Sequence, residues 1–133
     1  MQKISKFETV NNDQIALWRR LTDERIKKIL NAPNMEIPTG ATVYYVSNNG
    51  DDNNDGKTPE TALATLSAVN TIAFEGPTFV CFERGGLWRG QLNARRGVIY
   101  TAYGEGDKPK LYASPFDGAD ASLWTKTETP NIW

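Results

Sequence analysis

Apolar residues within Asn12–Leu30 recur at steps of three to five positions, as they do along one face of an amphipathic helix. These positions are Ile15, Trp18, Leu21, Ile26, Ile29 and Leu30. One helix over the whole stretch fits the pattern, and so do two short helices with a second start at Thr22. The following Pro33–Gly40 contains two prolines, so we expect an extended connector there and place the main structural boundary in it.

The remainder of the chain alternates between short β-type runs and turn-forming clusters. Thr42–Ser47 is β-branched and aromatic and predicts a strand, whereas the polar Asn48–Gly56 predicts a loop. A short helix follows, with either Thr58 or Thr65 as its N-cap. Four more strands are predicted at Phe79–Glu83, Leu87–Leu92, Val98–Tyr103 and Lys110–Tyr112. Because long helical crossovers are missing between them, this part is a sandwich, a roll or the coils of a β-solenoid.

Composition limits the classes of function. With 15 basic and 16 acidic residues among 133, the chain has no basic field for nucleic acid, so nucleic acid is not an expected partner. No apolar stretch approaches the roughly 18 residues of a spanning helix, and the first nine residues lack the apolar core of a signal peptide. Histidine is absent, which excludes Ser-His-Asp and Cys-His nucleophiles from this chain. The single cysteine, Cys81, lies in an apolar run and is predicted to be a buried hydrophobic residue.

Several segments, taken in order, resemble one known family. They are Tyr44–Ser47, Gly50–Gly56, Thr58–Glu60, Ala64–Leu66, Phe82–Gly90 and Tyr100–Gly104 with Pro109. This series, over roughly residues 40 to 115, resembles the N-terminal part of pectate-lyase-like right-handed parallel β-helix proteins of the bacterial carbohydrate-active type. A coil is one turn of such a solenoid.

The resemblance implies a mainly β fold with an N-terminal helix, the start of a parallel β-helix with a helical cap. Residues 1–40 would be the helical cap and linker, and residues 41–133 the first strand, a short helix and the first coils. The family builds its substrate groove from several successive coils, so we expect the chain to stop short of the coils that complete an active site. A cap is needed because a terminal coil otherwise exposes its apolar interior and its strand edges.

The function implied is that of a capping scaffold in a polysaccharide-processing protein, either a lyase or a glycoside hydrolase. Its partners would be polysaccharide and either downstream coils or a second copy bound at the open end, and its location extracellular, periplasmic or on the cell surface. Two alternatives stay open, namely a self-contained carbohydrate-binding module and a structural or adhesive β-helix. No catalytic motif of the family is present, so no residue is assigned a catalytic role.

Aromatic residues offer candidate sugar contacts. Trp88, Trp124 and Tyr103 are the candidates for stacking on sugar rings, and Tyr100 and Trp133 belong to the same aromatic set. The alternative interpretation is that these side chains fill the core and the junctions between coils.

Asp51, Asn53 and Asp55, followed by Gly56, match the opening of a calcium-binding loop. Position twelve of that loop, where a bidentate glutamate belongs, is Ala62. A polar turn without metal is the favoured explanation, because Asn and Asp form such turns with their own backbone. Calcium is the one cofactor that the sequence brings into consideration.

Overall fold

The computed structural model describes residues 12–125 and 127–129. The chain divides into two compact units, Met1–Pro33 and Asn34–Trp133, so the connector from residue 34 onward belongs to the second unit. Trp133 and the first nine residues lie outside the described residues. Within the part described, no helix is both long and apolar enough to cross a membrane.

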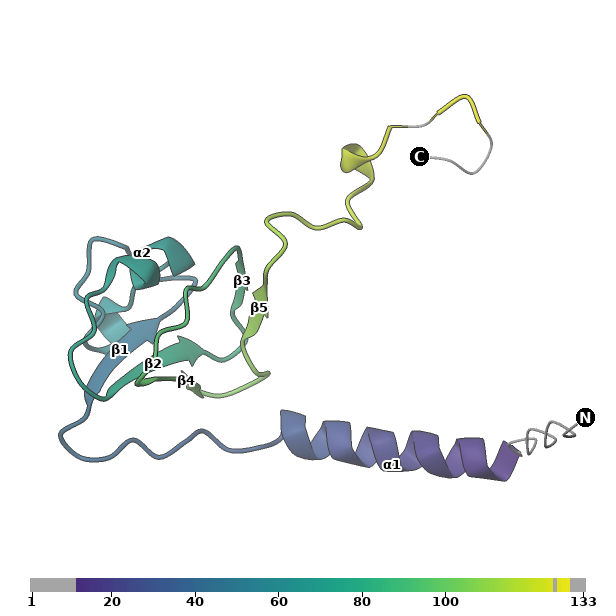
Figure 1. The fold of residues 1–133 in the computed structure, drawn as a ribbon, viewed down its shortest axis with the longest axis horizontal. Helices are drawn as coiled ribbons and strands as arrows, with labels where there is room; N and C mark the ends of the chain where they lie inside the picture. Colours follow the sequence, from purple (N-terminus) through teal and green to yellow (C-terminus); the bar gives the residue numbers. More distant parts are fainter. Residues whose placement is uncertain (1–11, 126, 130–133) are drawn as a thin grey trace, which may run out of the picture. The chain divides into compact units, whose positions relative to one another are not determined.

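The first unit contains one continuous helix, α1 (Asn12–Leu30), which confirms the longer of the two predicted arrangements (Figure 1). Asp13 lies in its first turn and Lys27 and Lys28 in its last, where each charge complements the helix dipole. None of its residues is buried. Its exposed large apolar side chains are Leu17, Trp18, Leu21, Ile26, Ile29 and Leu30.

The second unit contains the predicted strands and both predicted helix starts. Its elements are β1 (Thr42–Val46), η1 (Pro59–Thr61), α2 (Leu66–Thr71), β2 (Thr78–Glu83), β3 (Leu87–Arg89), β4 (Val98–Tyr103), β5 (Lys110–Tyr112) and η2 (Ala121–Leu123). Thr58 caps η1 and Thr65 caps α2, so the two alternatives for one helix are two separate elements. The strand predicted over Leu87–Leu92 ends at Arg89, because Gly90 adopts a φ of 127°, outside the strand region.

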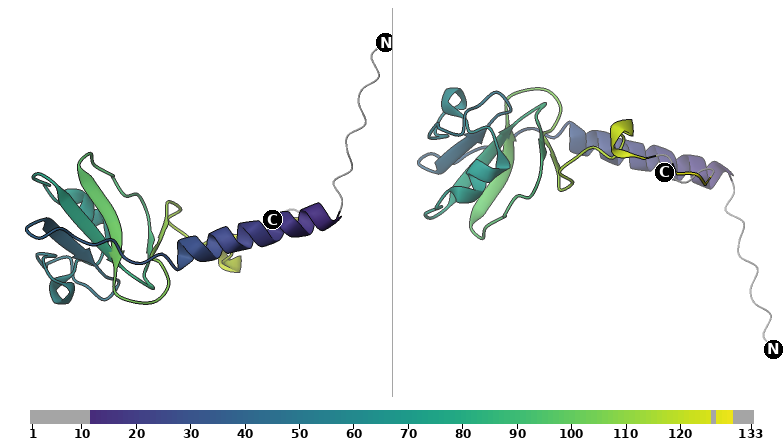
Figure 2. Two further views of the ribbon diagram at one scale, coloured as in Figure 1. Left: turned by 90° about the horizontal axis from the view of Figure 1, so that it is seen from below. Right: turned by 90° about the horizontal axis from the view of Figure 1, so that it is seen from above.

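The strands form two small parallel sheets. β1, β2 and β4 lie side by side in that order, and β3 pairs with β5 (Figure 1; Figure 2). Thr78 lies opposite Val98, and Leu87 lies opposite Lys110, so partners are 20 and 23 positions apart along the chain. The strands pair in parallel, which excludes an antiparallel sandwich among the predicted architectures. With the expected N-terminal helix α1 19 residues long, the architecture is mixed helix and strand, with parallel strands in small sheets.

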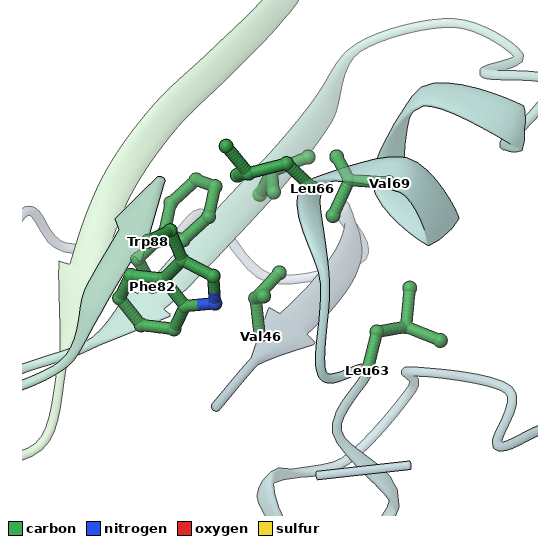
Figure 3. Packing of buried hydrophobic residues seen from close by; sticks show 7 residues of the cluster. Val46, Leu63, Leu66, Val69, Phe82 and Trp88 are labelled. Atoms are coloured by element: carbon green, nitrogen blue, oxygen red, sulfur yellow. The ribbon is translucent and has the colours of Figure 1, made fainter. Parts of the chain in front are cut away.

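The core lies between the three-stranded sheet and α2. Val46, Val80 and Phe82 point into this cluster from one face of β1 and β2, as the alternation of strand side chains requires, and the alternate β2 residues Phe79 and Cys81 are buried on the other face. Leu63, Leu66, Val69 and Trp88 complete the cluster (Figure 3). Cys81 is fully buried, and burial raises the pKa of its thiol to about 11, which confirms its prediction as a buried hydrophobic residue.

The outer edge of β1 is paired by the loop that follows it. The N–H of Tyr45 donates to Gly56 O at 2.7 Å, and the N–H of Ser47 donates to Leu63 O at 2.8 Å. Leu63 N–H in turn donates to Tyr45 O at 3.0 Å. Asp52 fixes the end of this loop, because its carboxylate accepts from Ala64 N–H, Thr65 N–H and the Thr65 hydroxyl. The loop therefore satisfies an edge that would otherwise be open.

β4 and β5 are the last strands of their sheets in the part described. The carbonyl of Tyr103 accepts from Arg84 N–H on the β2 side. Because backbone groups of successive strand residues point to opposite sides, the N–H groups of Tyr100 and Ala102 face the free edge. Tyr100 packs half-buried against the core, and Leu111 of β5 is 38% exposed. The two edges of the three-stranded sheet thus differ. The loop pairs with the β1 edge, and no strand of the described residues pairs with the β4 edge.

Glycine is required at position 50 because the loop after β1 passes very close there to the backbone of Ala62 and Leu63. A Cβ at this position would lie 2.5 Å from Ala62 O and 2.6 Å from Leu63 O, both backbone atoms. We therefore expect Gly50→Ala to lower the free energy of unfolding by about 1 to 3 kcal/mol. Urea-induced unfolding measures the difference. Gly118→Ala is the control, because a Cβ there meets nothing within 4 Å. Equal midpoints for the two variants would contradict this account.

Candidate functional site

A cleft of about 560 Å³ lies against β3, β5 and the segment that follows β5. We call it the outer cleft. It is lined by Leu87, Arg89, Leu111, Tyr112, Ala113, Ser114, Phe116, Asp117 and Gly118. Its volume is within the roughly 300 to 1,000 Å³ of small-molecule sites in proteins.

Arg89 is held in the outer cleft by three contacts. The strand register places it opposite Tyr112, and its guanidinium lies 5.0 Å from the centre of the Tyr112 ring. Arg89 Nη1 donates to Phe116 O at 3.0 Å, and Nη2 lies 3.2 Å from Asp117 Oδ2. The Arg89 side chain is only 25% exposed, whereas that of Asp117 is 64% exposed. An exposed ion pair contributes little to stability, but these contacts together orient the guanidinium.

Three exposed aromatic side chains lie in or beside the outer cleft. Tyr112 and Phe116 line it and are 42% and 57% exposed. Trp124 is 54% exposed, and its indole N–H donates to the carbonyl of Gly118, a lining residue, at 2.7 Å. Trp124 was a sequence candidate, whereas Tyr112 and Phe116 were not. No local sequence pattern marks these two residues, and their role emerges only once the fold places Arg89 beside them.

Trp88, another sequence candidate, is buried. It is 4% exposed, its ring packs edge to face on Phe82 at 5.1 Å, and its indole N–H donates to Ala64 O at 2.9 Å. No face of the ring is open to a sugar, which corrects its proposal as a stacking residue. The ring belongs to the buried core cluster, so it fills the core, as the alternative interpretation expected.

Tyr103, the third candidate, belongs to a polar cluster at the carboxyl ends of the three-stranded sheet. Ser47 follows β1, Glu83 ends β2 and Tyr103 ends β4. The Ser47 hydroxyl donates to Glu83 Oε2, and the Tyr103 ring meets the Tyr45 ring edge to face at 5.0 Å. Burial and the nearby charge of Glu83 raise the pKa of Tyr103 to about 12, while the interaction with the Ser47 side chain acts in the opposite direction. Tyr103 is therefore separate from Trp88 and from the outer cleft.

The three candidate calcium ligands lie in polar turns. Asp51 Oδ1 accepts from both the N–H and the side-chain amide of Asn53. Asp55 Oδ1 accepts from Lys57 N–H and from the Thr61 hydroxyl, and these hydrogen bonds lower the pKa of Asp55. Within the described ranges, no group of three or more Cys, His, Asp or Glu side chains is arranged to hold a metal ion. The local geometry is that of side-chain-to-backbone turns, and calcium binding stays a prediction.

No family model matches the chain, and no curated protein matches it. Two solved structures of a GH136 lacto-N-biosidase from Eubacterium ramulus, a native form and a selenomethionine derivative, are similar to it. Both share 28% identity over 73% of this chain and 15% of the enzyme, with TM-scores of 0.41 and 0.42. This chain therefore spans about one-seventh of the enzyme's length, and superpositions at these scores do not establish a shared fold.

We expect the alkaline titration of the Tyr103 phenol to depend on the charge of Glu83. Because the pKa of Tyr103 in the folded chain, about 12, lies above the value of about 10 for an unfolded tyrosine, its stabilising contribution is present below pH 10. It is lost as the pH rises from about 10 to about 12. We expect Glu83→Gln to shift the ultraviolet phenolate titration of Tyr103 to lower pH, because a negative charge is removed.

Tyr103→Phe identifies the phenolate signal in that titration. Glu105→Gln is the control, since it removes a carboxylate that lies outside the cluster. A Tyr103 titration that is the same in Glu83→Gln and in the parent chain would show that Glu83 does not act on it.

Proposed function

We propose that this chain supplies the closed end and the first coils of a parallel β-helix in a polysaccharide-processing protein of the lyase or glycoside hydrolase type. Its own role there is that of a capping scaffold. The observation that carries the proposal is the difference between the two edges of the three-stranded sheet. One edge is satisfied by backbone hydrogen bonds from a loop, and the other is the edge at which a further coil would add.

The order of the strands supports growth in one direction. After β1, the chain passes through β2 and β3 and then through β4 and β5, and each pass adds a parallel strand to each sheet. The offsets of 20 and 23 positions between partners are the length of one such pass. A third pass would add strands beside β4 and β5 in the same way. Repeats that contact only their neighbours in this manner are the basis of solenoid proteins.

The closed end consists of the segment between β1 and β2. Its backbone occupies the edge of β1 through Tyr45 and Ser47, and Leu66 and Val69 of α2 cover the apolar interior. The share of the capping role that the sequence interpretation gave to α1 stays a prediction.

The carbohydrate class rests on the ordered sequence resemblance over roughly residues 40 to 115. A second candidate function is that of a self-contained carbohydrate-binding module. The observation that favours it is the exposure of Trp124 beside the outer cleft, where an aromatic ring is open to ligand.

An open edge with half-buried apolar residues predicts self-association through β4. We expect the molar mass from sedimentation velocity to rise with protein concentration, since an unpaired edge is a template for another strand. Ala102→Pro should shift the chain toward the monomer, because proline removes an N–H that faces the free edge and is tolerated on edge strands. Thr101→Pro is the contrasting control, since its N–H faces β2, and it should destabilise the fold instead.

Two results would count against the proposal. One is a parent chain that stays monomeric at every concentration and melts cooperatively at high temperature. The other is an association that Ala102→Pro leaves unchanged, which would place the contact on a different surface.

A further inference from the structure

We propose that the outer cleft is a binding site for a short, uncharged oligosaccharide. The inference rests on the carbohydrate-handling function proposed above and adds to it a ligand class, a place and named contacts. It makes this segment a surface that contacts the glycan as well as a scaffold.

The aromatic side chains supply the apolar contacts. The C–H faces of sugar rings pack on flat aromatic surfaces, and such contacts need rings that are held in place and open to solvent. Phe116 is 57% exposed, and Tyr112 carries Arg89 over its ring. Trp124 is fixed beside the cleft by its hydrogen bond to Gly118 O. Rings fixed in this way lose little conformational freedom when a ligand binds.

The polar contacts come from the Arg89–Asp117 pair. Arg89 has five N–H donors, and its contacts with Phe116 O and Asp117 leave others for a ligand. Asp117 Oδ1 accepts from Ala119 N–H at 3.1 Å and Oδ2 meets Arg89, yet each carboxylate oxygen has a further lone pair. A sugar hydroxyl is both donor and acceptor, so it can bridge two such groups at once. The pair presents both kinds of partner in a fixed arrangement.

The charge of the outer cleft selects against ionic ligands. Arg89 and Asp117 are the charged residues among those that line it, and they neutralise each other. A uronate or a phosphate would meet the 64% exposed carboxylate of Asp117, while a cation would meet the guanidinium. An uncharged polyol avoids both costs. The cleft volume of about 560 Å³ suits a short oligosaccharide better than a single small ion.

The test is a binding screen of the full chain by affinity electrophoresis and by calorimetry. The probes are uncharged gluco-, manno-, xylo- and N-acetylglucosamine tetrasaccharides, with oligogalacturonate as the acidic counterpart. We expect at least one uncharged probe to bind and oligogalacturonate to bind more weakly. Phe116→Ala should weaken binding by about three- to ten-fold through the loss of one stacking contact.

Asp117→Asn should also weaken binding, because it keeps the size of the side chain while removing the charge that orients Arg89. Trp18→Ala is the matched control, since it removes an exposed aromatic residue of α1 and should leave affinity unchanged. Circular dichroism of each variant confirms that it is folded.

If none of the uncharged probes binds, the inference is overturned. A preference for oligogalacturonate would overturn it as well. Binding that survives both Phe116→Ala and Asp117→Asn would place the glycan elsewhere and overturn it equally. None of these outcomes affects the self-association test with Ala102→Pro, so the outer cleft can fail while the β-helix proposal stands.

Discussion

The second unit depends on one constraint: every strand of a parallel sheet presents backbone donors and acceptors on both sides, and each side needs a partner or water. On the β1 side, this requirement is met by the loop that returns through Gly56 and Leu63. The close backbone approach at Gly50 and the hydrogen bonds to the Asp52 carboxylate hold the returning segment beside β1. On the β4 side no strand of the described residues pairs with the edge, and Val98 and Tyr100 pack there half-buried against the core.

The scaffold role and the ligand-binding role that we propose for this chain rest on different residues. The scaffold is built from inward side chains and from edge hydrogen bonds, and Trp88 and Phe82 belong to it. The outer cleft is built from outward positions of the small sheet, where Arg89 and Tyr112 lie opposite each other. Leu111 lines the outer cleft as well and lies opposite Trp88, so the cleft and the core meet at that position. Phe116 and Asp117, by contrast, come from the segment after β5, which contributes no residue to the core cluster.

Local signals in the sequence were sufficient for most elements. Thr58 and Thr65 each cap an N–H group that lies only a few residues further along the chain, and β-branched runs mark β1 and β2. These features are therefore determined by near neighbours in the sequence. The contacts of Asp52 with Ala64 and of Asp117 with Arg89 join segments 12 or more residues apart, which no local pattern reveals. Trp88 illustrates the limit: its neighbours along the chain do not show which face it lies on, whereas its packing on Phe82 and its hydrogen bond to Ala64 O do.

Hydrogen exchange of individual amides, followed by NMR on the monomeric fraction, tests the central claim most directly. The account predicts alternation along β4, with slow exchange at Thr101 and Tyr103, which face β2, and fast exchange at Tyr100 and Ala102, which face the open edge. Along β1, by contrast, Tyr45 and Ser47 should exchange slowly because the loop carbonyls accept from them. Uniform protection along β4, or fast exchange at Tyr45 and Ser47, would contradict a chain with one closed edge and one open edge.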